Sequence, residues 1–365
     1  ISISSSGAVT LSSDFVPSTS LSHRNLIING AMQVAQRGTS HAGQTASEYH
    51  LDRFKTIISG IGTYTVSQDS DSPNNFGNSL KIDCTTADAS PAAGDHLGLH
   101  YRFEGQDLQQ MSKGTSDAKS VTISFDVKSN KTGDFQVNLL DQDNNRIIAS
   151  TVTINSAETW ESKSLTFTGD TTGALDNDNA NSLILEMIFD AGSNWTTGAV
   201  PTAWETTVLA DRGAGVTLGL ADSTANYLNI TGVQLELGSV ATPFEHRSYA
   251  DELKRCKRYY EKIVIGTYGT HGMYSGQGRF YVPHIHYDTE KRASPTVTIT
   301  ASNSYWVQPG QAVYSAYGAH TFTPVNVNVS GHAGYNTRPG GGSTPSGNNV
   351  YIYENTVTHV AKIEL

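Results

Sequence analysis

The stretch Val121-Thr-Ile-Ser-Phe-Asp-Val127 decides the fold class, because its apolar and polar residues alternate strictly. Successive side chains of an extended strand point to opposite faces. Val121, Ile123, Phe125 and Val127 therefore share one face, and the polar residues between them share the other. This pattern predicts a β-strand with one buried face.

The same alternation recurs on both sides of this stretch, at residues 80–84, 99–103, 148–154 and 165–167. Clusters of Gly, Asn, Asp and Ser separate these runs, as turns do between short strands. Residues 183–189 are apolar almost without interruption, which fits either a strand buried on both faces or a short buried helix. We therefore expect residues 24–247 to form a sheet-rich domain.

A change of parity marks the run from Tyr227 to Leu237. Leu228 and Ile230 alternate before Gly232, whereas the apolar positions after it are odd-numbered. A β-bulge at Gly232 would keep both halves facing the core.

Residues 248–262 change to a helical period. Apolar side chains at Tyr249, Leu253, Cys256 and Tyr260 step by four, three and four, and Ser248 resembles a helix cap. Strand alternation resumes afterwards, so this helix is expected to link two β domains. The later strands are expected at 280–287, 297–299, 325–329 and 350–353.

The composition excludes several classes of protein. Only 16% of the 365 residues are charged, and the formal net charge is −10. This balance disfavours nucleic acid and anionic membranes as partners, and no apolar stretch is long enough to span a bilayer. Cys84 and Cys256 are the only cysteines, which excludes a disulfide framework but leaves one long-range bridge open.

Several segments resemble the C-terminal part of tail-fibre and related virion proteins of bacteriophages, including marine and cyanobacterial phages. They are Asn25-Leu-Ile-Ile-Asn-Gly-Ala-Met-Gln-Val-Ala-Gln-Arg-Gly38, Tyr49-His-Leu-Asp-Arg-Phe54, Tyr101-Arg-Phe-Glu-Gly-Gln-Asp-Leu108, Thr159-Trp-Glu161, residues 232–247 and Cys256-Lys-Arg-Tyr-Tyr260. Residues 135–169 also look like jelly-roll carbohydrate-binding modules. The resemblance implies a homotrimeric virion appendage, assembled in the host cytoplasm and exposed extracellularly, which contacts other tail or capsid proteins and a host-surface glycan.

Together these observations predict an all-β protein. A Ser-rich connector (1–23) precedes a jelly-roll β-sandwich similar to carbohydrate-binding modules (24–247). One short helix (248–262) then leads into a second, smaller β-sandwich domain (263–365). Low charge and abundant Ser, Thr, Asn and Tyr suit the broad, wet interfaces of a trimer.

Two patterns suggest metal ions, each with a simpler alternative. Residues 141–146 begin like a calcium loop but lack its Gly and Glu positions, and a hairpin turn between Leu140 and Ile147 explains them better. His284 and His286 would share one strand face. At a trimer axis such pairs resemble the iron sites of some phage fibres, whereas Pro283 favours two exposed histidines on an edge strand. We expect no cofactor, and the alternative is a structural calcium or iron ion.

Aromatic side chains are the candidates for glycan contact, because sugars offer an apolar face ringed by hydroxyls. The candidates are Trp195, Trp204, Tyr305, Trp306 and Tyr335. Each fits core or interface packing equally well. We expect receptor contact in residues 263–365, whose Gly-rich loops carry many Tyr and His residues.

Catalysis has little support in the sequence. Glu158 and Glu161 would point to opposite faces of an extended segment, and no hydrolase, zinc-protease or phosphate-loop motif is present. We therefore expect a non-catalytic receptor-binding subunit. The alternatives are a purely structural virion subunit and a glycan depolymerase.

Overall fold

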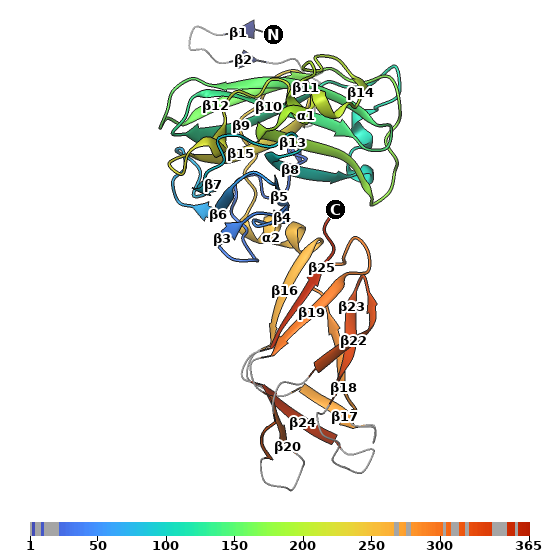
Figure 1. The fold of residues 1–365 in the computed structure, drawn as a ribbon. Coiled ribbons are helices and arrows are strands. Elements are labelled where there is room, and N and C mark those ends of the chain that lie inside the picture. Colours follow the sequence, from blue (N-terminus) through green and yellow to red (C-terminus); the bar gives the residue numbers. More distant parts are fainter. Residues whose placement is uncertain are drawn as a thin grey trace.

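The computed structural model contains two β domains joined end to end (Figure 1). It describes residues 2–3, 9–10, 22–265, 270–274, 279–301, 304–307, 314–317, 321–337, 349–354 and 357–365. Strands dominate both domains, so the prediction of an all-β fold is confirmed.

The first domain is a sandwich of two antiparallel sheets. The seven-stranded sheet has the order β14 (Glu205–Thr206), β11 (Arg146–Ile154), β10 (Gly133–Asp141), β13 (Asn181–Ala191), β8 (His96–Glu104), β5 (Phe54–Ser59) and β4 (Glu48–Tyr49). The six-stranded sheet has the order β12 (Glu161–Phe167), β9 (Val121–Ser129), β15 (Tyr227–Leu237), β7 (Ser79–Thr86), β6 (Thr63–Asp69) and β3 (Ser40–Gln44). Strands from β7 to β13 cross repeatedly between the two sheets, as in a jelly roll.

Short elements complete this part of the chain. They are β1 (Ser2–Ile3) and β2 (Val9–Thr10), the helix α1 (Ser193–Thr196), and the 3₁₀ turns η1 (Gly105–Asp107), η2 (Gln109–Met111), η3 (Leu209–Asp211) and η4 (Leu220–Asp222).

The core lies between the two sheets, and the alternation in the sequence explains it. Val121, Ile123, Phe125 and Val127 of β9 are all buried, at 0–2% exposure. The ambiguous run at 183–189 lies within the strand β13, where both faces are buried. The seven-stranded sheet is therefore covered on its outer side as well, by the segment that contains α1 and η3.

The bulge in β15 occurs where the parity changed. The register of β15 against β9 shifts between Thr231 and Gln234, and Gly232 adopts a φ of 64°. Beyond the bulge, residues 25–30 take the place of β7: Leu26 N–H donates to Leu235 (2.9 Å), and Val233 N–H donates to Gly30 (3.0 Å).

The linking helix α2 (Tyr249–Lys257) begins at Ser248, whose hydroxyl accepts from Asp251 N–H. It is shorter than predicted, because the chain turns at Arg258 and enters β16 at Tyr260. The tyrosine that continued the helical period is the first residue of a strand, and neither Cys84 nor Cys256 is bridged.

The second domain also consists of antiparallel sheets. A three-stranded sheet contains β16 (Tyr260–Ile265), β25 (Val357–Lys362) and β19 (Thr296–Ala301). A seven-stranded sheet contains β21 (Tyr314–Tyr317), β20 (Ser304–Val307), β24 (Asn349–Glu354), β17 (Thr270–Tyr274), β18 (Arg279–His286), β23 (Gly331–Thr337) and β22 (Thr321–Asn328). All four strands predicted after the helix coincide with strands of these sheets, although β18 and β22 each end one residue before the predicted ranges 280–287 and 325–329 do.

A buried arginine connects the two domains. Arg53 is 1% exposed, and its guanidinium lies 3.5 Å from the ring centre of Tyr259 and 4.9 Å from that of Tyr101. Beside it, the Arg258 guanidinium donates two hydrogen bonds, of 2.8 and 2.7 Å, to the Glu104 carboxylate. The stacking of Arg53 and the ion pair between Arg258 and Glu104 thus both stabilise the junction between the sandwich and α2.

The end of β25 closes the same junction from the other side. Tyr49 and Arg102 of the sandwich each donate a 2.8 Å hydrogen bond to the Leu365 carbonyl, and Arg37 pairs with the nearly buried Glu364. We call this set of contacts the joint. Apart from Glu364 and Leu365, its residues come from four of the segments that carry the phage resemblance, 25–38, 49–54, 101–108 and 256–260.

Among the described residues, no helix combines the length and the apolar character needed to cross a bilayer.

Candidate functional site

A groove of about 910 Å³ lies on the outer face of the six-stranded sheet. Its floor is built from the outward-facing residues of β9 and of the edge strand β12. Ser124 lies opposite Ser164 in the register, and Asp126 lies opposite Ser162. The same alternation that buries Phe125 therefore places a row of hydroxyls and one carboxylate on the solvent side.

One wall of the groove is the loop between β6 and β7. Phe76 N–H closes a turn onto Pro73 (3.1 Å), and the Ser72 hydroxyl donates to the Phe76 carbonyl (2.7 Å). The Thr231 hydroxyl of β15 donates to Asn78 (2.7 Å) and ties the loop to the sheet. These bonds hold the Phe76 ring over the bulge.

The other wall is the segment 241–246, which folds back across β15. Two outward-facing side chains of β15 hold it there, although both are buried. The Glu236 carboxylate accepts from Thr242 N–H (2.8 Å) and from its hydroxyl (2.7 Å), and Gln234 accepts from Glu245 N–H (2.9 Å). The segment therefore has a fixed course, and it presents Phe244 and His246 to the groove.

Three rings from these two walls form one cluster. The Phe76 and Phe244 centroids are 5.1 Å apart in an edge-to-face arrangement, and His246 lies 5.2 Å from Phe76 and 4.8 Å from Phe244. Phe76 and Phe244 are half-buried and His246 is exposed. The cluster offers an apolar, partly solvent-accessible surface beside the polar floor.

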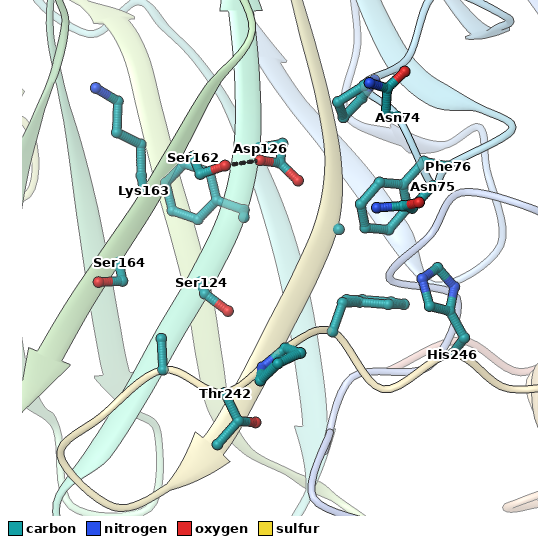
Figure 2. Close-up of a pocket in the computed structure, with 16 residues that line it drawn as sticks. Asn74, Asn75, Phe76, Ser124, Asp126, Ser162, Lys163, Ser164, Thr242 and His246 are labelled. Carbon is teal, nitrogen blue, oxygen red and sulfur yellow. Dashed lines mark hydrogen bonds between the residues drawn. The ribbon is translucent and has the colours of Figure 1, made fainter. Parts of the chain in front are cut away.

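Asp126 is the charged group at the centre of the groove. Its Oδ1 accepts a hydrogen bond from the Ser162 hydroxyl, and Figure 2 shows the carboxylate facing the ring of Phe76 across the groove. Partial burial raises the pKa of Asp126, while the bond from Ser162 lowers it. A carboxylate of this kind is an acceptor for hydroxyl groups.

The groove combines an apolar surface with a polar one. An apolar cluster faces a floor with Ser124, Ser162 and Ser164 hydroxyls, with Asn74 and Asn75 amides at the rim. Asp126 is the only carboxylate among the described residues that line the groove, whereas glycoside hydrolysis ordinarily uses two.

The tryptophans singled out in the sequence lie elsewhere. Trp195 is only 6% exposed, and its ring packs against His96 and the Arg212 guanidinium. Trp204 is half-buried, and its indole N–H donates to Thr168 (2.7 Å). Both rings pack on the sandwich away from the groove.

The remaining aromatic candidates belong to the second domain. Tyr305 and Trp306 lie on β20, and Tyr335 lies on β23. Their side chains are outside the described residues, as is the Gly-rich segment 338–348. Contact by these residues stays a prediction.

The histidine pair lies on β18, and both rings are exposed, with centroids 4.6 Å apart. The expectation of an edge strand is wrong for β18 as a whole, which lies between β17 and β23, but its pairing with β17 ends at Tyr281. Pro283 is tolerated because the register with β23 shifts between Val282 and Ile285, which removes the need for its missing N–H. Binding of iron by His284 and His286 in a trimer is untested.

The loop 141–146 is the hairpin turn between β10 and β11. Lys113 places its ammonium group among oxygens that resemble a cation site: Asp141 Oδ2 at 2.5 Å, Asp170 Oδ2 at 3.0 Å, and the carbonyls of Thr172 and Gly173 at 3.1 and 2.9 Å. Within the described part of the chain, no group of three His, Cys, Asp or Glu side chains is arranged to hold a metal ion.

The chain was compared with family models, curated proteins and solved structures. No family model matches the chain, and no curated protein matches it. Among solved structures it is similar to the enzymatically active domain of bacteriophage CBA120 tailspike protein 4 (14% identity, TM-score 0.31), over 59% of this chain and 21% of that one.

It is also similar to a family 11 carbohydrate-binding module from Clostridium thermocellum in complex with a β-1,3-1,4-mixed-linked tetrasaccharide. That match has 10% identity and a TM-score of 0.29, and covers 57% of this chain and 98% of that one. TmCBM61 in complex with β-1,4-galactotriose matches at 7% identity over 59% and 99% of the two chains, with a TM-score of 0.28. Identities and scores this low say nothing of the ligand, activity or assembly of this chain.

Proposed function

We propose that this protein binds a host-surface glycan in the groove and serves as a non-catalytic subunit of a phage virion appendage. The observation that carries the binding proposal is the position of the aromatic cluster of Phe76, Phe244 and His246 beside the Asp126 carboxylate and the serine hydroxyls. Sugars present an apolar C–H face and a rim of hydroxyl groups, which these two surfaces complement.

The absence of catalysis is part of the proposal. It is supported by the single carboxylate among the described lining residues, because neither the retaining nor the inverting arrangement of acid and base can be made from Asp126 alone. Release of reducing sugar from host polysaccharide by the purified protein would contradict it.

The virion role rests on the phage-like segments of the sequence. The homotrimer, the partnership with tail or capsid proteins and the extracellular exposure belong to the same proposal. Light scattering of the purified chain should give three times the monomer mass. Antibodies against the chain should label the virion and block its adsorption to cells; labelling without blocking would favour a purely structural subunit.

The binding experiment uses the full chain and the variants Phe76→Ala and Phe244→Ala, titrated against oligosaccharides from the host envelope. Loss of one aromatic contact should weaken binding about tenfold. Val208→Ala is the matched control, because Val208 is exposed near η3 on the other sheet. Unchanged affinity in both Phe variants would remove the groove as the binding site.

A further inference from the structure

Among the described residues in and beside the groove, Asp126 is a carboxylate with no cationic partner, whereas the two nearby lysines are each paired with another carboxylate. The Lys163 side chain leads away from Asp126 (Figure 2), and its ammonium group lies 2.5 Å from the Glu161 carboxylate. Lys128, the next outward-facing residue of β9 beyond Asp126, pairs with Asp71 at 2.7 Å. Neither ammonium group is available to balance a negative ligand.

The Asp126 charge is held in place. Its Ser162 partner is a neutral hydroxyl that orients the carboxylate without neutralising it. On the aromatic side, Phe76 and Phe244 are apolar, and His246 lies at the rim. A negative group on a ligand in this groove would therefore meet a like charge in a partly desolvated setting, where the repulsion is weakly screened.

From this arrangement we propose that the groove selects uncharged glycans, and that Asp126 is the residue that excludes anionic ones. The proposal rests on the proposed function, that is, on the groove being the glycan site. For a neutral sugar, Asp126 is a hydroxyl acceptor. For a chain of uronic acids or of phosphorylated sugars, the same carboxylate is a repulsive element that lowers affinity without any steric clash.

The test compares ligands that differ only in charge. Cellohexaose, maltohexaose and mannohexaose are titrated against the full chain at pH 8, above the range in which an imidazole ordinarily carries charge. Each is compared with its form in which the primary hydroxyls have been oxidised to carboxylates. The wild type should bind at least one neutral sugar, and its oxidised form should bind about tenfold more weakly at low salt. Added salt should reduce this difference in affinity between the neutral and the oxidised sugar, because it screens the repulsion from Asp126.

Asp126→Asn keeps an acceptor for Ser162 and removes the charge. This variant should raise the affinity for the oxidised ligand about tenfold relative to the neutral one. Glu205→Gln, an equal change of charge on the exposed edge strand β14, should leave the ratio unchanged.

Equal or tighter binding of the oxidised form by the wild type, or an unchanged ratio in Asp126→Asn, would overturn the selectivity and leave the glycan site standing. If neither charged nor neutral sugars bind, and the Phe76→Ala and Phe244→Ala variants do not alter attachment to host cells, the proposed function itself fails.

Discussion

Gly232 is the residue on which the shape of the groove depends. Its φ of 64° disfavours any side chain, and an added Cβ would lie 2.8 Å from the Phe76 ring and 3.0 Å from Asp126 Oδ2. We expect Gly232→Ala to lower the free energy of unfolding by about 1–2 kcal/mol. It should also weaken glycan binding, because the new methyl group displaces Phe76 from its place over the bulge.

Gly43→Ala separates these two effects. Gly43 has a similar φ of 70°, but an added Cβ there would meet nothing within 4 Å. Chemical unfolding and ligand titration of both variants should show a loss of stability in each but a loss of affinity only in Gly232→Ala. Equal affinities would mean that Phe76 does not depend on the glycine.

At the scale of single residues, the sequence predicted the backbone conformation at Gly232 but not the residues of the groove. The bulge at Gly232 follows from the change in apolar parity, which is a local signal. The aromatic cluster does not, because Phe76 and Phe244 come from loops far apart in the chain. Nothing near either residue indicates that Thr231 and Glu236 fix those loops against the same strand. The tryptophans drew attention by their size, yet Trp195 and Trp204 pack against the sandwich.

At the scale of elements, the two sheets of the second domain are tied together by a buried histidine pair. His332 of β23 and His359 of β25 lie 2.9 Å apart between Nε2 and Nδ1, and the second nitrogen of His332 contacts the Tyr287 hydroxyl at 3.1 Å. Burial first, and then the charge of a neighbouring histidine, His284 for His332 and His332 for His359, lowers the pKa of both to about 4.

This pair makes the second domain sensitive to acid. Between pH 6.5 and 4 the unfolded chain binds more protons than the folded one, so the stability is complete above pH 6.5 and is lost as the pH falls towards 4. The loss is about 3 kcal/mol for one such histidine. Urea unfolding at pH 7.5 and 5.0 should show about 2 kcal/mol of this loss for one such histidine, because pH 5.0 lies above the lowered pKa. His359→Gln should flatten the dependence, whereas His286→Gln, at an exposed position, should not.

Comparing His359→Gln with the wild type also removes the contributions of other histidines to the pH dependence. Burial also lowers the pKa of His50 in the sandwich to about 4, but this contribution is common to wild type and variants and cancels in the difference. A pH dependence as steep in His359→Gln as in the wild type would show that the pair is not responsible.

Strands and helices were predicted correctly where the spacing of apolar residues is unambiguous. They were predicted wrongly where contacts with distant parts of the chain override that spacing. The alternation in β9 and the cap at Ser248 indicated a strand and a helix start correctly. The helix was extended too far because Tyr260 continues its apolar stripe, whereas Tyr260 is the first residue of β16. Pro283 suggested an edge strand because the local sequence does not reveal that a bulge removes the need for its N–H.

At the scale of the whole molecule, four of the segments on which the resemblance to phage fibre proteins was based supply residues of the joint. They share little as local elements, but the fold brings 25–38, 49–54, 101–108 and 256–260 to one place, where the sandwich, α2 and the end of β25 meet. This has a practical consequence for locating the receptor site. Deleting residues 263–365 would remove Glu364 and Leu365, and would leave Arg37 and Tyr49 without these partners, so loss of binding by a truncated protein would not identify its cause.

We predict that the joint makes the two domains unfold as one unit. Arg53→Met removes a charge that is buried against Tyr101 and Tyr259 and lies 3.6 Å from Glu364. Removal of one partner from such a buried set costs about 3–5 kcal/mol. Wild-type calorimetry should therefore show a single transition. Arg53→Met should lower the midpoint and split the transition in two, because each domain keeps its own sheets and hydrogen bonds. The midpoint of Arg53→Lys should lie between those of the wild type and Arg53→Met, because this variant keeps the charge but loses the planar stacking.

Lys262→Met serves as the matched control, because it removes a charge at an exposed position of β16 near the joint and should leave the single transition intact. Glycan affinity in the groove should survive Arg53→Met below the first transition, because no joint residue lines the groove. Small-angle scattering should meanwhile report a broader range of domain orientations. Two transitions in the wild type would contradict a rigid joint. If instead the variant keeps one transition at the wild-type midpoint, Arg53 does not contribute to the coupling, which must then reside in the other contacts of the joint, between Arg258 and Glu104 and around Glu364 and Leu365.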